Sequence, residues 1–246
     1  MIGSLAINAC PICGGADFAQ SEILWPELIE DWELAPAEVA YINQQQGLYC
    51  RECRASLRSM TLASALREAF GFSGLFRAFC APDGPAAHLD MLEINEADHL
   101  SQYLGALPRH RLVKFPEVDM QRLPFAESVY DVVLHSDTLE HVPNSMSALR
   151  ECLRVLRPGG RLAFTIPIVI GRLTRKRAGL KNSFHGKEGL SAADYRVETE
   201  YGADFWCEVM GAGFAEVRLH ALRFPASVAI VARKSCAASF VRPAPV

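Results

Sequence analysis

The chain has 246 residues, of which half are hydrophobic and 22% are charged, so it can bury a substantial core and is not a disordered protein. This length suits one large domain, or one domain with a small additional module. A formal net charge of −3 excludes a protein that coats nucleic acid through bulk positive charge, although it is compatible with a local basic patch.

The first residues of the chain do not resemble a targeting segment. Residues 1–8 lack the basic region and the apolar length of a secretory signal. The longest apolar run, 162–170, is interrupted by Pro167 and is far shorter than the roughly 20 residues that span a bilayer. These features predict a cytoplasmic protein without a transmembrane helix.

Four of the eight cysteines form two regularly spaced pairs, Cys10-Pro-Ile-Cys13 and Cys50-Arg-Glu-Cys53. Two thiolates separated by two residues can face one ion from a tight turn, and two such turns complete the four-cysteine shell of structural zinc. In a reducing compartment this spacing favours a metal over disulfides. A closed thiolate shell would support folding and not catalysis. The alternative is four unrelated buried cysteines.

The segments on either side of the second cysteine pair predict helices. Residues 25–41 are acidic and amphipathic, which indicates a helical insertion between the pairs. Residues 55–70 place apolar side chains at helical spacing on one face. We assign residues 1–70 to a zinc-ribbon-like module with a connecting helix. We expect this module to pack against the rest of the chain, because only residues 71–84 separate that helix from the next strand.

From residue 88 onward, strand-like and helix-like segments alternate, which predicts an α/β fold with a mostly parallel sheet and helices on both faces. Pro108 ends a helix that carries Leu100, and proline and two glycines in 157–161 end another that begins near Asn144. The expected strands are 88–94, 111–115, 129–136, 162–166, 215–221 and 224–233, with a helix at 204–214 before the last two.

Four motifs follow one another in the middle of the chain. They are Asp119 shortly before Leu123-Pro-Phe, then Tyr130-Asp-Val-Val, Leu139-Glu-His-Val-Pro and Arg154-Val-Leu-Arg-Pro-Gly-Gly. In this order and at this spacing they resemble the central block of class I S-adenosylmethionine-dependent methyltransferases, and the resemblance covers roughly residues 86–234. It implies a Rossmann-like domain, which we place at 71–234, with an insertion at 167–200 and a tail at 235–246. An N-terminal four-cysteine zinc knuckle also occurs in some of these enzymes, including certain ribosomal RNA guanine methyltransferases.

The resemblance implies that the turn after the first strand holds the cofactor, S-adenosylmethionine. Glu93 matches the acidic residue that ends this strand, while Asn95, Ala97 and His99 stand where glycines are usual. Asparagine tolerates the left-handed region best after glycine, and alanine adds only one methyl group. The following helix N-terminus offers N–H groups to the methionine carboxylate. Alternatively, Asn95 and Asp98 only form a capping box.

Further cofactor contacts implied by the resemblance follow the next two strands. Glu117 is the local candidate for the carboxylate that accepts hydrogen bonds from both ribose hydroxyls, and an uninvolved, exposed glutamate is the alternative. Asp119 and Met120 match positions that contact the adenine. The backbone carbonyls around His135 and Ser136, at the carboxyl edge of the sheet, are expected to receive the ammonium group of the cofactor.

Acceptor-side residues are expected at the same edge. Methyl transfer is a displacement at a sulfonium, so the protein contributes mainly positioning, and a base is needed only for a hydroxyl or a protonated amine. Candidates are Asp137, His141, His185 and Tyr195, although His141 has the alternative of only packing its helix. His185 belongs to the insertion 167–200, which in this family commonly covers the active site.

The basic run 172–181 has two interpretations, a contact to phosphate or a solvated lid. The phosphate would belong to RNA, a nucleotide-sugar or a lipid-linked glycan. The leading hypothesis is a methyltransferase for a small-molecule or glycan-like acceptor. One alternative is an RNA methyltransferase that docks through the zinc module. The other is a non-catalytic protein that keeps the fold for partner binding, as the glycine-free turn suggests.

Overall fold

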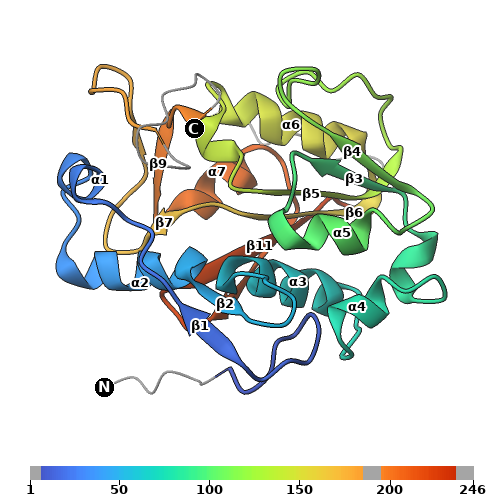
Figure 1. Ribbon diagram of the computed structural model, residues 1–246. Coiled ribbons are helices and arrows are strands. Elements are labelled where there is room, and N and C mark those ends of the chain that lie inside the picture. Colours follow the sequence, from blue (N-terminus) through green and yellow to red (C-terminus); the bar gives the residue numbers. More distant parts are fainter. Residues whose placement is uncertain (1–6, 185–194, 237–246) are drawn as a thin grey trace.

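A six-stranded sheet of order β10-β11-β6-β5-β3-β4 forms the centre of the computed structural model, which describes residues 7–184 and 195–236 (Figure 1). The strands β4, β3, β5 and β6 are parallel to one another. At one edge, β11 is antiparallel to β6, and β10 is antiparallel to β11. The expected α/β fold is therefore confirmed. The strands are β3 (Met91–Ile94), β4 (His110–Val113), β5 (Tyr130–Ser136), β6 (Leu156–Thr165), β10 (Glu216–Leu222) and β11 (Ser227–Arg233).

Helices cover both faces of this sheet, because successive residues of a strand point to opposite sides and both sides are apolar. Leu92 and Val133 belong to one core, and Met91 and Val132 belong to the other. The first face is covered by α6 (Ser145–Val155) and α7 (Phe205–Gly211), and the second by α3 (Leu57–Ala69), α4 (Phe76–Phe79) and α5 (Ser101–Leu104) (Figure 1).

The strand order reverses at β3. From β3 the chain passes to β4 on one side, and it then returns to β5 on the other side. In open α/β sheets, ligands bind at the carboxyl ends of the strands where such a reversal leaves a crevice. The turns that follow β3 and β5 are therefore the first place to look for a site.

The segment between the two cysteine pairs contains a two-stranded ribbon and two helices. Strand β1 (Phe18–Gln20) pairs antiparallel with β2 (Leu48–Cys50), and α1 (Pro26–Asp31) and α2 (Pro36–Gly47) lie between them. Each helix begins with proline, which is favoured there because the first helical N–H has no partner. The apolar side of α1 packs against Val169 and Val197. The predicted helical insertion is confirmed.

The insertion after β6 forms a small sheet of order β7-β9-β8 on the left of Figure 1, from β7 (Ile168–Val169), β8 (Arg175–Lys176) and β9 (Thr199–Gly202). Most of its basic run 172–181 is exposed, as the solvated interpretation expects, but Arg172 and Arg177 of the run are paired. The guanidinium of Arg172 lies 2.7 Å from the Glu38 carboxylate and donates to the carbonyl of Trp32 at 2.6 Å. Arg177 is 6% exposed and pairs with Glu200. These contacts fasten α1 and α2 to the small sheet.

Two elements differ from the sequence prediction. The helix at Leu100 is shorter than expected, because a 3₁₀ helix (Asp98–Leu100) leads into an α5 that already ends at Leu104. Strand β6 begins at Leu156 and not at Leu162, because Leu156 pairs with Tyr130 before an irregularity in the register.

Helix α3, which we assigned to the cysteine module, lies on β6, β10 and β11 and so covers the sheet. The domain boundary between residues 70 and 71 stays a prediction.

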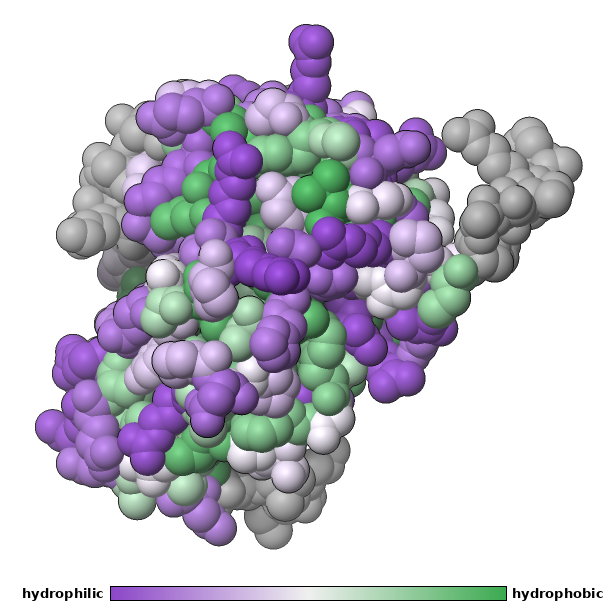
Figure 2. All heavy atoms as spheres, turned by 90° about the vertical axis from the view of Figure 1, so that its right-hand side faces the viewer, coloured by the Kyte–Doolittle hydropathy of each residue, from purple (hydrophilic) through white to green (hydrophobic). Residues whose placement is uncertain are grey.

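The surface on the right of Figure 1, where α4 and α5 lie, is shown in Figure 2. Hydrophilic and hydrophobic residues are interspersed over this face. Within residues 7–184 and 195–236, no helix combines the length and the apolar character that crossing a bilayer demands.

Candidate functional site

The four paired cysteines converge on one point. The sulfur atoms of Cys10 and Cys53 are 3.6 Å apart, as are those of Cys13 and Cys50. All four lie within 4.8 Å of one another. A tetrahedral Zn²⁺ with Zn–S bonds of about 2.3 Å separates its sulfur ligands by about 3.8 Å, so the donor set and its spacing fit this ion.

Each cysteine pair lies on a tight turn that contains a left-handed residue. Gly14 has φ 89° and Arg54 has φ 65°. Their amides donate to the carbonyls of Cys10 and Cys50 at 2.8 and 2.9 Å. The reversal that the sequence predicted at Gly14 is confirmed, and the second turn has the same form without glycine.

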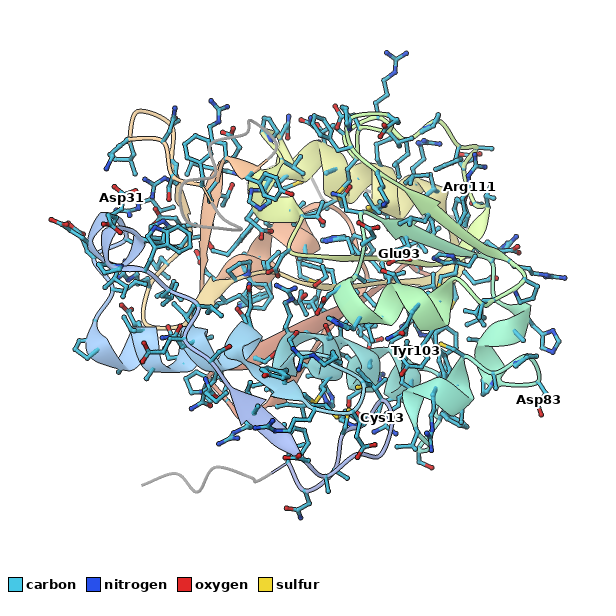
Figure 3. All side chains as sticks on the ribbon, in the orientation of Figure 1. Cys13, Asp31, Asp83, Glu93, Tyr103 and Arg111 are labelled. Atoms are coloured by element: carbon cyan, nitrogen blue, oxygen red, sulfur yellow. The ribbon has the colours of Figure 1, made fainter. Side chains whose placement is uncertain are left out.

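The cysteine cluster is continuous with the core of the sheet. Cys13 lies beside Tyr103 of α5 in Figure 3, and both pack in the core on the α3 face. Burial raises the pKa of the Cys10 thiol to about 11 and also raises that of Cys53. Because burial opposes ionisation of these two thiols, a cation would stabilise them as thiolates, which is the condition that a bound metal meets.

The turn after β3 lies at the reversal of the strand order and contains two left-handed residues, Asn95 with φ 55° and Asp98 with φ 52°. The left-handed conformation expected at Asn95 is confirmed. Its side-chain oxygen accepts from the amide of Phe115 at 3.0 Å, and its nitrogen lies 3.4 Å from the hydroxyl of Thr138. Asn95 therefore connects the carboxyl ends of β3, β4 and β5.

Glu93 holds this turn from inside. Its carboxylate is fully buried and accepts from the amide of Ala97 at 2.8 Å and from the hydroxyl of Ser101. Its other oxygen is 2.7 Å from Nε2 of His110. Figure 3 shows Glu93 between β3 and α5. These contacts shape the turn, while direct contacts of Glu93 and Ala97 with a cofactor stay predictions.

Asp98 attaches the same turn to the start of α3. Its carboxylate accepts from the hydroxyls of Ser59 at 2.7 Å and Ser56 at 3.3 Å, and it lies 2.7 Å from Nδ1 of His99. Burial opposes ionisation, but these hydrogen bonds and the charge of Arg58 outweigh it and lower the pKa of Asp98. Neither Asn95 nor Asp98 caps the following helix, so the capping-box alternative is wrong.

Arg58, in the first turn of α3, is a site residue that the sequence reasoning missed. Its side chain is 13% exposed and its guanidinium pairs with Asp137, which follows β5 in a left-handed conformation with φ 43°. The amide of Gln46 donates to the same carboxylate oxygen at 2.9 Å. Burial raises the pKa of Asp137, although Arg58 acts in the opposite direction. The sequence offered one indication of this role, namely a single arginine in the first turn of an otherwise apolar helix.

Glu140 and His141 follow Asp137 in a 3₁₀ helix. Glu140 is 1% exposed, and among the described residues neither of its carboxylate oxygens has a hydrogen-bond partner. Burial, followed by the nearby charge of Asp137, raises the pKa of Glu140 well above its usual range. Nδ1 of His141 donates to the carbonyl of Arg196 at 2.9 Å, and its Nε2 lies 3.6 Å from Glu140. Asp137 and His141 are thus brought to one place, as predicted.

The predicted adenosine contacts lie along the chain after β4. Glu117 is exposed. The carboxylate of Asp119 accepts from the amide of Gln121 at 2.8 Å. Met120 is 3% exposed and belongs to the core on the α6 face. Whether these three positions meet a cofactor stays a prediction.

His135 and Ser136 belong to the interior of the sheet. The ring of His135 stacks on Phe164 with 4.7 Å between centroids, and burial lowers its pKa to about 3, so it is a neutral core residue. The hydroxyl of Ser136 lies 2.7 Å from that of Thr165. Any contact from these positions must therefore come from their backbone, as the sequence prediction stated. His185 lies outside the described residues.

A cavity of about 470 Å³ lies between α1, α2 and the chain after β6. Gln46 lines this cavity and also donates to Asp137, so the cavity borders the cluster at the end of β5. The lining residues are Glu22, Ile23, Leu24, Trp25, Leu28, Trp32, Leu34, Ile42, Gln45, Gln46, Pro167, Ile168 and Val169.

Comparisons with known proteins agree with this geometry. Residues 73–164 match the family model described as a methyltransferase domain. The chain is 34% identical over 100 residues to a ubiquinone/menaquinone biosynthesis C-methyltransferase of Ectopseudomonas mendocina, an alignment that covers 37% of each protein. It is 43% identical over 51 residues to the 27-O-demethylrifamycin SV methyltransferase of Amycolatopsis mediterranei, which covers 21% of this chain and 19% of that protein.

Among solved structures, a methyltransferase from Thermotoga maritima that depends on S-adenosylmethionine is 16% identical, with a TM-score of 0.38 and coverage of 72% of this chain and 89% of that one. The curated relatives are thus matched over little more than a third of their length at most. The matched region contains β3, β4, β5 and the turns at their carboxyl ends. Residues 73–164 of the chain are therefore similar to a methyltransferase domain.

Proposed function

We propose that this protein transfers a methyl group from S-adenosylmethionine to a small-molecule acceptor. The supporting observation is the turn at Asn95–Asp98, which lies at the reversal of strand order inside a methyltransferase domain. Two relatives are named for reactions on a quinone precursor and a rifamycin, which supports a small molecule over a glycan-like acceptor.

The proposed cofactor seat runs along the ends of β3, β4 and β5. The backbone at Asn95 and Ala97 would face the methionine part, and Glu117 and Asp119 would face the ribose and adenine. Arg58 lies at the same edge with its side chain 13% exposed, and its guanidinium is suited to the cofactor carboxylate because it can donate two parallel hydrogen bonds.

The proposed reaction breaks the S–CH₃ bond with its electron pair left on sulfur, while a lone pair of the acceptor forms the new bond to the methyl group. The chain contributes position and exclusion of water. For a hydroxyl acceptor, Asp137 or His141 would take the proton. Burial raises the pKa of Asp137, which makes its carboxylate a better proton acceptor. His185 stays a proposal of the same kind.

We also propose that Cys10, Cys13, Cys50 and Cys53 hold one structural Zn²⁺. A shell of four thiolates leaves no position for water, so this ion would support folding only. Zinc content measured by mass spectrometry of the metal tests this assignment, and one equivalent per chain is expected.

Calorimetry with S-adenosylhomocysteine tests the cofactor site directly. Both Asn95→Gly and Asn95→Val lose the side-chain hydrogen bonds to Phe115 and Thr138, but glycine adopts a positive φ freely. The Asn95→Val variant should therefore bind S-adenosylhomocysteine at least tenfold more weakly than Asn95→Gly, because a β-branched residue is strained at φ 55°. Absence of binding by the parent protein at millimolar concentration would instead support the non-catalytic alternative.

The RNA alternative is less well supported, because arginines of the basic run are already paired with Glu38 and Glu200. If RNA were the substrate, its affinity would fall steeply with salt concentration. Phosphate contacts lose most of their affinity between about 50 and 200 mM salt. A filter-binding titration over this range of about 50 to 200 mM should show only weak RNA binding at both ends.

A further inference from the structure

We infer that the acceptor is an uncharged, planar, largely apolar ring compound that occupies the cavity between α1, α2 and β7. This inference rests on the proposed function and specifies its substrate class. A cavity of about 470 Å³ has an aromatic and aliphatic wall and borders the cluster at Asp137.

The size and the walls of the cavity select the ligand. Small-molecule sites typically have about 300–1,000 Å³ and are lined by apolar and aromatic side chains with few polar groups. Trp25 and Trp32 supply two ring surfaces, and most other lining residues are Leu, Ile, Val or Pro. The indole N–H of Trp32 donates to Ser183 at 2.8 Å, and the guanidinium of Arg177 lies over its ring. The ring of Trp32 is therefore held in place, and Trp25 is the main surface for stacking.

The charges around the cavity disfavour anions. Of the described residues that line it, none is Lys, Arg or His, and Glu22 adds a negative charge at an exposed position. A phosphate placed there would lose its hydration without gaining a cation. A glycan would bury many hydroxyls against a wall whose uncharged polar side chains are Gln45 and Gln46. Both substrate classes are therefore poor fits.

The polar end of the cavity gives the ligand a direction. Gln46 connects the cavity to Asp137, and the amide of Asp137 donates to the carbonyl of Thr165 at 3.0 Å, two residues before the Pro167 wall. A ring seated among the tryptophans would therefore point a hydroxyl toward the carboxylate of Asp137. The oxygen of this hydroxyl would form the bond to the methyl group, and the hydroxyl proton would pass to the carboxylate of Asp137.

The test is calorimetry of the full chain, saturated with S-adenosylhomocysteine, with three probes. We expect 1-naphthol to bind with one site per chain. We expect 1-naphthyl phosphate, which adds only the phosphate, to bind at least tenfold more weakly, and maltose to give no binding. Equal or tighter binding of the phosphate or of maltose would overturn the inference.

Two variants of cavity residues, with a third variant as control, test whether 1-naphthol binds in this cavity. Trp25→Ala should weaken its binding at least tenfold, whereas Trp206→Ala, on the outer side of α7 and 46% exposed, should leave it unchanged. Ile23→Lys adds a cation to the wall and should reverse the preference toward 1-naphthyl phosphate. Equal affinities in all three variants would contradict the assignment. Thermal unfolding of each variant controls for folding.

The cofactor titration separates the two proposals. If S-adenosylhomocysteine binds and 1-naphthol does not, the substrate class is wrong while the proposed activity stands. If 1-naphthol binds in the cavity without any cofactor binding, the proposed activity fails and the pocket stands.

Discussion

The proposed cofactor side and the proposed acceptor side of the carboxyl edge are held in place by different kinds of contact. On the proposed cofactor side, the polar side chains of Glu93, Asn95 and Asp98, of which Glu93 is fully buried, connect the turn after β3 to β4, to Phe115 and to α3 through hydrogen bonds. On the acceptor side, two short helices pack apolar surface on β7, and their chain leaves and returns through the two cysteine pairs. The turn after β3 is therefore held by hydrogen bonds to neighbouring elements of the sheet domain. The segment that contains α1 and α2 is held at its two ends, where the cysteine pairs lie.

The largest effect is expected where the acceptor side is anchored. Cys50→Ser removes one ligand of the proposed metal and should lower the free energy of unfolding by roughly 4 kcal/mol or more, the range of metal-loss mutations. Zinc content should fall to none. Urea unfolding checks this, with Cys207→Ser as the control because Cys207 is exposed on α7. An unchanged stability would mean that the cluster does not anchor this segment.

The next effect concerns the cofactor side. Glu93→Ala leaves His110 and the amide of Ala97 without their buried partner and should lower the free energy of unfolding by about 3 kcal/mol. The matched control is Glu96→Ala, which removes only an exposed pair with Lys114 and should change stability by less than about 1 kcal/mol. Similar losses in both variants would show that the buried network does not fix the turn.

A smaller effect is expected from the clasp between α2 and the small sheet. Arg172→Ala removes the bonds to Glu38 and to two backbone carbonyls and should cost about 2 kcal/mol, in line with hydrogen bonds of charged groups. Lys181→Ala is the control, since that side chain is 82% exposed. Chemical denaturation measures both, and a loss in the control as large as in the variant would contradict the clasp.

The smallest effect is a dependence of the free energy of unfolding on pH, which we expect from Glu140. The pKa of Glu140 is raised in the folded protein, so the folded state binds its proton more tightly, and its contribution to stability is lost as pH rises above the unfolded value of about 4.3. Glu140→Gln removes this loss and should be more stable than the parent at pH 8, with no difference near pH 4. The slope cannot exceed about 1.4 kcal/mol per pH unit for one proton. A pH-independent difference would contradict this.

Local chemistry made part of the structure predictable. Gly14 and Asn95 were assigned to reversals because few residues accept a positive φ, and both adopt it. The strands β5, β10 and β11 were read from apolar runs between turns. His135 was harder, because both faces of β5 are buried and alternation then gives no direction.

Contacts between distant segments could not be read from the sequence. The partner of Arg172 is Glu38, 134 positions earlier, and nothing near the basic run indicates it. Arg58 lies 79 positions before Asp137. The cavity likewise joins residues before the second cysteine pair to residues after β6, so only the folded chain reveals it.

One oxygen atom of Asp137 contacts residues on both the proposed cofactor side and the proposed acceptor side. Oδ2 of Asp137 accepts from Arg58 and from Gln46 at once. A methyl donor that draws the guanidinium toward its own carboxylate would leave Gln46 as the remaining donor, and so would alter the wall that the second substrate meets. Such coupling is reciprocal, each ligand changing the affinity of the other by the same factor. We therefore expect the two substrates to load in a preferred order.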